Sequence, residues 1–110
     1  MQVKRNIYFL QDASSAIEGA VQSNVTGETL TVQVEGDATS FSFQLLGCSD
    51  YYSEDFYAIT GFTTAFEPIT TITSKGIYTF GIEGLSKIKV NLTAVSGGAL
   101  TVFGKITQGV

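Results

Sequence analysis

Hydrophobic and polar residues alternate along most of the chain from Thr29 onward. The pattern is clearest in five runs, residues 30–34, 41–45, 78–82, 88–92 and 100–106. Alternation places successive side chains on opposite faces of a β-strand, so each run predicts a strand with one buried face. The chain shows no alternation of strands with helical segments, which argues against a parallel sheet.

Turn signals separate these runs at residues 36–37, 84–86 and 96–99. In the last of them, Gly97 and Gly98 accept the positive φ angles of a tight turn, which predicts a β-hairpin. Short strands with close turns predict an all-β fold, an antiparallel β-sandwich of the jelly-roll or immunoglobulin type with about seven or eight strands.

The middle of the chain is less regular. Residues 49–57 predict a loop, whereas residues 56–63 and 66–73 have an extended character without clean alternation. Pro68 cannot donate a hydrogen bond to a neighbouring strand, so its strand is expected to lie at a sheet edge or to begin there.

Residues 11–22 are ambiguous. Their apolar members fall on one helical face and Asp12 is placed to cap a helix, but Ser14, Ser15 and Gly19 are weak helix formers. This segment is predicted to form a short helix or an irregular arm.

The chain of 110 residues fits one domain. Within it, residues 1–28 are expected to form an N-terminal arm and first strand, and residues 29–110 the body of the sandwich. The apolar residues that follow Lys4 and Arg5 need a partner to become ordered. They either pair as a strand in their own sheet or reach a neighbouring subunit, as assembly arms do.

Composition and charge exclude several classes of function. The formal net charge is −4, so the protein repels phosphate backbones and nucleic-acid binding is not expected. The single cysteine, Cys48, allows no internal disulfide, which fits folding in a reducing cytoplasm. We expect no membrane span and no secretion signal, because the apolar runs are too short.

The absence of histidine removes the commonest general base and metal ligand. Cys48 therefore lacks an imidazole to activate it and is expected to be a small buried thiol next to a loop. Zinc binding is effectively ruled out. The sequence predicts a protein that is not an enzyme and that uses no cofactor and no metal.

One loop combines acidic and aromatic side chains. Its members are Asp50, Tyr51, Tyr52, Glu54, Asp55 and Tyr57. The acids alone are typical of a solvated loop, and the rings would cover an open end of the sandwich. Together they also suit a sugar-binding patch or a protein contact. A glycosidase that uses the paired acids is the least favoured alternative. Lys87 and Lys89 share a strand face that is expected to be solvated.

Four segments of the chain share a recognisable pattern of strands and glycine turns: residues 30–36 (LTVQVEG), 76–80 (GIYTF), 84–93 (GLSKIKVNLT) and 96–102 (SGGALTV). With this pattern the sequence resembles small β-sandwich structural proteins of tailed bacteriophages, and the resemblance covers residues 29–107. Such domains often carry a tryptophan after the first hairpin, where this chain has tyrosines and Phe56. The resemblance implies a virion component, such as a capsid decoration protein or a tail accessory protein, and it transfers no catalytic residues.

We therefore predict a non-enzymatic virion structural protein, made in the bacterial host cytoplasm, that decorates the outside of the capsid. Its expected partner is the major capsid protein or another virion protein, with a possible homo-oligomer and no membrane or nucleic acid. Partner contacts are predicted at Lys4, Arg5, Tyr8, Tyr51, Tyr52 and Tyr57. The alternative is a carbohydrate-binding module of a tail or fibre.

Overall fold

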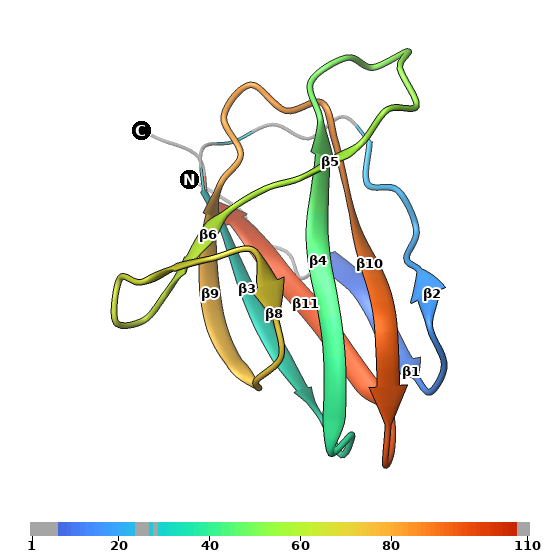
Figure 1. Ribbon diagram of the computed structural model, residues 1–110. Helices are drawn as coiled ribbons and strands as arrows, with labels where there is room; N and C mark the ends of the chain where they lie inside the picture. Colours follow the sequence, from blue (N-terminus) through green and yellow to red (C-terminus); the bar gives the residue numbers. More distant parts are fainter. Residues whose placement is uncertain (1–6, 24–26, 28, 108–110) are drawn as a thin grey trace.

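The chain folds into two β-sheets packed face to face (Figure 1). The structure is a computed structural model that describes residues 7–23, 27 and 29–107. Within these residues it contains strands and turns and no helix, so none that could cross a membrane. The predicted fold class, an antiparallel β-sandwich, is confirmed.

The first sheet has six strands and the second has five, and every pair of neighbours is antiparallel. The order in the six-stranded sheet is β1 (Ile7–Ala13), β11 (Leu100–Thr107), β3 (Thr29–Gly36), β9 (Gly76–Gly81), β6 (Gly61–Thr63) and β7 (Pro68–Ile69). The five-stranded sheet runs β2 (Ile17–Glu18), β10 (Lys87–Ser96), β4 (Ser40–Cys48) and β5 (Tyr57–Ala58), and β8 (Thr71–Ile72) also pairs with β4.

The alternating runs become strands whose apolar face is buried between the sheets. Leu30, Val32 and Val34 of β3 face inward from one sheet, and Phe43 and Leu45 of β4 do so from the other. The described residues form eleven strands rather than seven or eight, because β2, β5, β6, β7 and β8 have only two or three residues each. Segments that short carry no readable alternation.

The prediction of a β-hairpin at residues 96–99 is wrong, because the strands on either side of this turn do not pair with each other. The turn joins β10, in the five-stranded sheet, to β11, in the six-stranded sheet. The turns at residues 36–37 and 84–86 also cross between the sheets. The expected positive φ angles are present, 76° at Gly97 and 144° at Gly98. The Asp37 carboxylate accepts a hydrogen bond of 2.8 Å from the Ala99 amide, and this bond lowers the pKa of Asp37. Local sequence therefore specified the turns but not the sheet that each following strand joins.

The helix considered for residues 11–22 is also wrong. The described N-terminal residues pair within their own sheet as β1, next to β11, and the chain then continues as an irregular arm that includes β2. Asp12, the proposed helix cap, has a φ of 51°, and its amide donates to Thr101 Oγ1. A Cβ atom on Gly19 would lie 2.4 Å from the Phe9 carbonyl oxygen, so the close approach of these segments requires glycine.

Residues 57–72 cross between the sheets twice. β5 belongs to the five-stranded sheet, β6 and β7 to the six-stranded sheet, and β8 to the five-stranded sheet again. The two crossings lie together, since the hydroxyl oxygens of Thr60 and Thr70 are 2.8 Å apart. Pro68 begins β7 at the end of its sheet, which confirms its predicted place at an edge.

Candidate functional site

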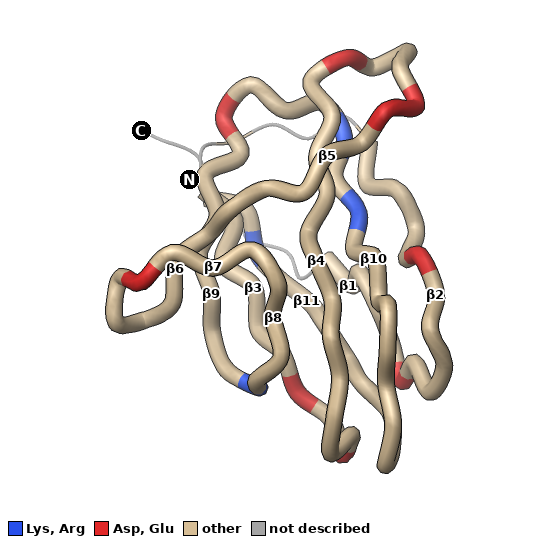
Figure 2. The backbone as a smooth tube through the Cα atoms, viewed as in Figure 1, with Lys and Arg blue, Asp and Glu red and all other residues tan. Residues whose placement is uncertain are grey.

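The loop that joins β4 to β5 projects from one end of the sandwich, at the top of Figure 1. We call residues 49–57 the tyrosine loop. Figure 2 shows acidic residues spaced along it and basic residues on the neighbouring part of β10. This loop holds most of the residues that the sequence singled out for binding.

Hydrogen bonds fix the backbone of the tyrosine loop. The Tyr52 amide donates to Asp50 Oδ1 at 2.9 Å, and the Asp55 amide donates to Ser53 Oγ at 3.1 Å. Cys48 is buried, as predicted, and its thiol lies 3.2 Å from the Asp50 carbonyl oxygen. The Lys87 ammonium donates to the Ser53 carbonyl oxygen. The loop is therefore held in one shape, and one of its three acids is engaged in holding it.

Phe56 fastens the end of the loop to β10. Its ring centre lies 4.3 Å from Lys89 Nζ and 5.4 Å from Lys87 Nζ, distances at which a cation interacts with an aromatic face. Lys89 also pairs with Glu18 of β2, with 3.5 Å between Nζ and Oε1. The two lysines share a strand face, as expected, but they are half-buried beneath Phe56 rather than solvated.

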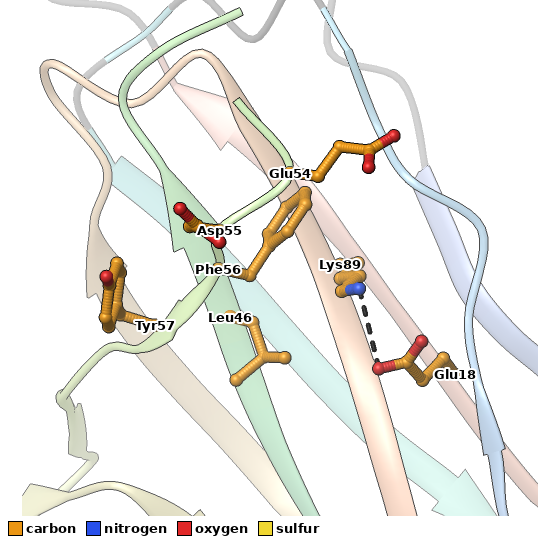
Figure 3. A pocket seen from close by; sticks show the side chains of 7 residues that line it. All are labelled: Glu18, Leu46, Glu54, Asp55, Phe56, Tyr57 and Lys89. Atoms are coloured by element: carbon orange, nitrogen blue, oxygen red, sulfur yellow. Dashed lines mark ion pairs between the residues drawn. The ribbon is translucent and has the colours of Figure 1, made fainter. Parts of the chain in front are cut away.

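A groove of about 330 Å³ opens beside this cluster (Figure 3). Its lining comes from four separate segments of the chain: Glu18, Leu46, Glu54, Asp55, Phe56, Tyr57 and Lys89. Asp55 and Tyr57 also line a second depression, of about 360 Å³, near Cys48 and Leu85. The groove thus combines carboxylates, one ammonium group and two aromatic rings, a set that suits a polar ligand with an apolar face.

The three tyrosines of the loop are exposed but divide into two groups. Tyr51 and Tyr52 pack edge to face, with ring centres 5.3 Å apart, and Tyr52 keeps 89% of its surface exposed. Tyr57 is 72% exposed and borders the groove. These side chains therefore do not cover the open end of the sandwich, which was one of the roles predicted for them.

The other predicted contact residues lie elsewhere. Tyr8 is on β1, where its ring lies 5.4 Å from that of Phe103 on the outer face of the six-stranded sheet. Lys4 and Arg5 lie outside the described residues. The structure thus pairs Tyr51 with Tyr52, places Tyr57 beside the groove on the same loop and places Tyr8 on a different surface.

Comparison with known proteins assigns the chain to a family. The family model named XepA matches residues 3–106. The chain belongs to the XepA family.

Two solved structures resemble this XepA-family chain over 94% of its length. The crystal structure of the SPBc2 prophage-derived protein YomS superposes with a TM-score of 0.84 at 25% sequence identity, over 92% of YomS. The crystal structure of the PBSX exported protein XepA gives a TM-score of 0.86 at 26% identity, over 37% of that chain. A search of curated proteins gave no match. The relatives are phage-derived proteins, which supports the predicted resemblance to phage β-sandwich proteins as a class.

Two exposed apolar features of this XepA-family chain were not predicted from its sequence. Phe66 lies at the tip of the β6–β7 hairpin, and Phe62, Ile77 and Phe103 lie on the outer face of the six-stranded sheet. Ile77 and Phe103 occupy positions that alternation assigns to solvent, next to the buried Tyr78 and Val102. Apolar residues at strand positions where the alternation expects polar ones were the sequence signal that could have predicted this exposed apolar face.

Across residues 7–23, 27 and 29–107, no three Cys, Asp or Glu side chains gather closely enough to hold a metal ion. The acids of the tyrosine loop are spread along its length instead (Figure 2).

Proposed function

We propose that this XepA-family chain is a non-enzymatic phage structural protein that decorates the outside of the capsid. In this proposal it is made in the host cytoplasm, ends in the virion and binds the major capsid protein. Its similarity to prophage proteins supports a phage role, and the exported relative XepA fits a final location outside the cell.

The observation that carries the proposal is the exposed Tyr51–Tyr52 pair on a loop with a fixed backbone. Tyrosine supplies a large apolar area and a polar hydroxyl at a low cost in side-chain entropy, and it is enriched among the residues that dominate protein interfaces. Because hydrogen bonds already order the loop, little further freedom is lost on binding.

Replacing both tyrosines, Tyr51→Ala with Tyr52→Ala, is expected to weaken binding to purified capsids at least tenfold. Interface tyrosines of this kind often contribute about 2 kcal/mol each. The measurement is cosedimentation of the protein with capsids that lack it. Ile17→Ala, which removes an exposed side chain of β2 instead, is the control and should bind normally. Undiminished binding of the double variant would refute the proposal.

A second candidate, binding of a carbohydrate by a tail or fibre module, is favoured by the groove. There Tyr57 offers an exposed ring next to Asp55 and Glu54, and sugars bind through stacking on rings and hydrogen bonds to carboxylates. If this candidate holds, Tyr57→Ala loses at least tenfold in affinity on a glycan array. Tyr51→Ala should then keep its affinity, because Tyr51 is not among the residues that line the groove. An array on which the unmodified protein binds no glycan would rule the candidate out.

A further inference from the structure

The positive charges beside the groove are turned inward and already have partners. Lys87 and Lys89 are half-buried, and both ammonium groups lie over the Phe56 ring. The side chain of Lys89 is only 14% exposed, and Glu18 balances its charge at 3.5 Å. Neither lysine is therefore free to neutralise a charge at the mouth of the groove.

The exposed charges at this end of the sandwich are negative. Glu54 and Asp55 are exposed, and neither forms an ion pair with any residue that the structure describes. Asp50 lies in the same loop, and Glu83 lies in the β9–β10 loop, which is hydrogen-bonded to residues 48–49. Figure 2 shows these acids around the end of the molecule. A partner that approaches this end meets a negative potential, which attracts basic surfaces.

An aromatic face borders the unpaired carboxylates. Tyr57 is 72% exposed, and Figure 3 shows the Asp55 carboxylate between the side chains of Phe56 and Tyr57. The ring of Phe56 already interacts with lysine ammonium groups, whereas no Lys or Arg in the described part of the chain lies over the ring of Tyr57. The groove thus offers an aromatic face and a carboxylate side by side, both without a cationic partner.

A guanidinium group satisfies both features at once. It is planar and weakly hydrated, so it stacks on an aromatic ring while its edge donates hydrogen bonds to a carboxylate. An ammonium group is compact and strongly hydrated and cannot stack in this way. A neutral sugar would use the ring but would leave the negative charge unbalanced. The chemistry of the groove therefore selects arginine.

We propose that the groove receives an arginine side chain of the partner protein, stacked on Tyr57 and hydrogen-bonded to Asp55. A cavity of about 150 Å³ holds a benzene ring, so a groove of about 330 Å³ has room for the guanidinium group and the methylenes next to it. Tyr51 and Tyr52 contact the same partner from the same loop. The inference rests on the proposed function for the identity of the partner, whereas recognition of the guanidinium group can be measured without it.

Titration with small amides tests the groove without a capsid. In an NMR titration of the full chain at low salt, N-acetylarginine amide should shift the backbone amides of residues 54–57, with at least threefold higher affinity than N-acetyllysine amide. The citrulline analogue has nearly the same shape but no charge and should cause no saturable shift. Raising sodium chloride to about 0.5 M should weaken arginine binding at least threefold, because salt screens exposed charges. Equal shifts from the arginine and citrulline amides, or none from arginine, would overturn the proposal.

Single substitutions locate the binding within the groove. Asp55→Asn, which removes the charge at nearly constant size, and Tyr57→Leu, which removes the aromatic face, should each lower the affinity for arginine amide at least threefold. Both positions are exposed, so the melting temperature should stay the same. Glu35→Gln removes an equal charge from an exposed position on β3, in the other sheet, and should bind as the unmodified chain does. An equal loss in Glu35→Gln would mean that net charge, not the groove, attracts the cation.

Capsid binding separates a failure of this inference from a failure of the proposed function. In cosedimentation, Glu54→Gln with Asp55→Asn should weaken binding to capsids at least tenfold. If this variant binds normally while Tyr51→Ala with Tyr52→Ala does not, the capsid role holds and the arginine contact is wrong. If arginine amide binds the groove but the unmodified chain binds no capsid, the guanidinium site holds and the capsid role is wrong. A neutral glycan that binds the groove more tightly than arginine amide would overturn the inference in favour of the carbohydrate candidate.

Discussion

Phe43→Ala is expected to lower the free energy of unfolding by about 3–5 kcal/mol, the range for removing a buried phenylalanine ring. Phe43 is 1% exposed and is among the largest fully buried side chains. It lies in β4, opposite Leu92 of β10 and Ile72 of β8, and its ring stacks on Phe41 at 6.2 Å between centres. These neighbours belong to three different strands, so they cannot all move inward to fill the cavity that the substitution leaves.

Urea unfolding followed by circular dichroism measures this loss. The midpoint should fall while the dependence on urea concentration stays the same, because the change removes packing rather than altering the surface exposed on unfolding. Phe62→Ala is the matched control, since Phe62 is exposed on the outer face of the six-stranded sheet. This control substitution should lower the free energy of unfolding far less than Phe43→Ala does. A loss below about 1 kcal/mol for Phe43→Ala would contradict the packing described for the core.

Gly61→Val is expected to destabilise the fold by about 3 kcal/mol or more, at the upper end for overpacking. A Cβ atom at this position would lie 2.5 Å from the Thr79 carbonyl oxygen and 2.6 Å from the Phe80 ring. Gly61 begins β6, where the chain enters the six-stranded sheet from the other sheet. The strand cannot move away without losing its pairing with β9.

Gly81→Ala is the control for this prediction. Gly81 ends β9, and an added Cβ would meet nothing within 4 Å. The stability of the Gly81→Ala variant should be unchanged or higher by up to about 1 kcal/mol, because alanine restricts the unfolded chain more than glycine does. Thermal unfolding of both variants checks the pair. Equal effects at positions 61 and 81 would mean that the close approach at Gly61 is absent.

The alternating strands were predictable because burial on one face imposes a period of two on the sequence. The residues expected to face the core, such as Val32, Phe43 and Val90, are buried. Strand pairing was not predictable to the same extent. Glycines at positions 97 and 98 specify a turn through their φ angles, but the same angles serve a hairpin or a crossing between sheets. Only packing over the whole domain decides between them.

The candidate site was predictable in part for a similar reason. The exposed tyrosines could be read from one stretch of sequence, since residues 51–57 are contiguous. The groove could not, because Glu18 and Lys89 reach it from strands far apart in the chain. The apolar spacing of residues 11–22 pointed to a helix, whereas contact of Gly19 with Phe9 favours an irregular arm.

The place of β11 has a consequence for how the protein is made. This strand lies between β1 and β3, although it follows them by many residues in the chain. During translation, β1 and β3 therefore wait without their shared neighbour, and both present unpaired backbone edges until residues 100–107 leave the ribosome. Pairing that depends on such distant segments is slow. The nascent chain is thus most exposed to aggregation just before synthesis of β11 is complete, and chaperones are expected to matter most to its yield in that period.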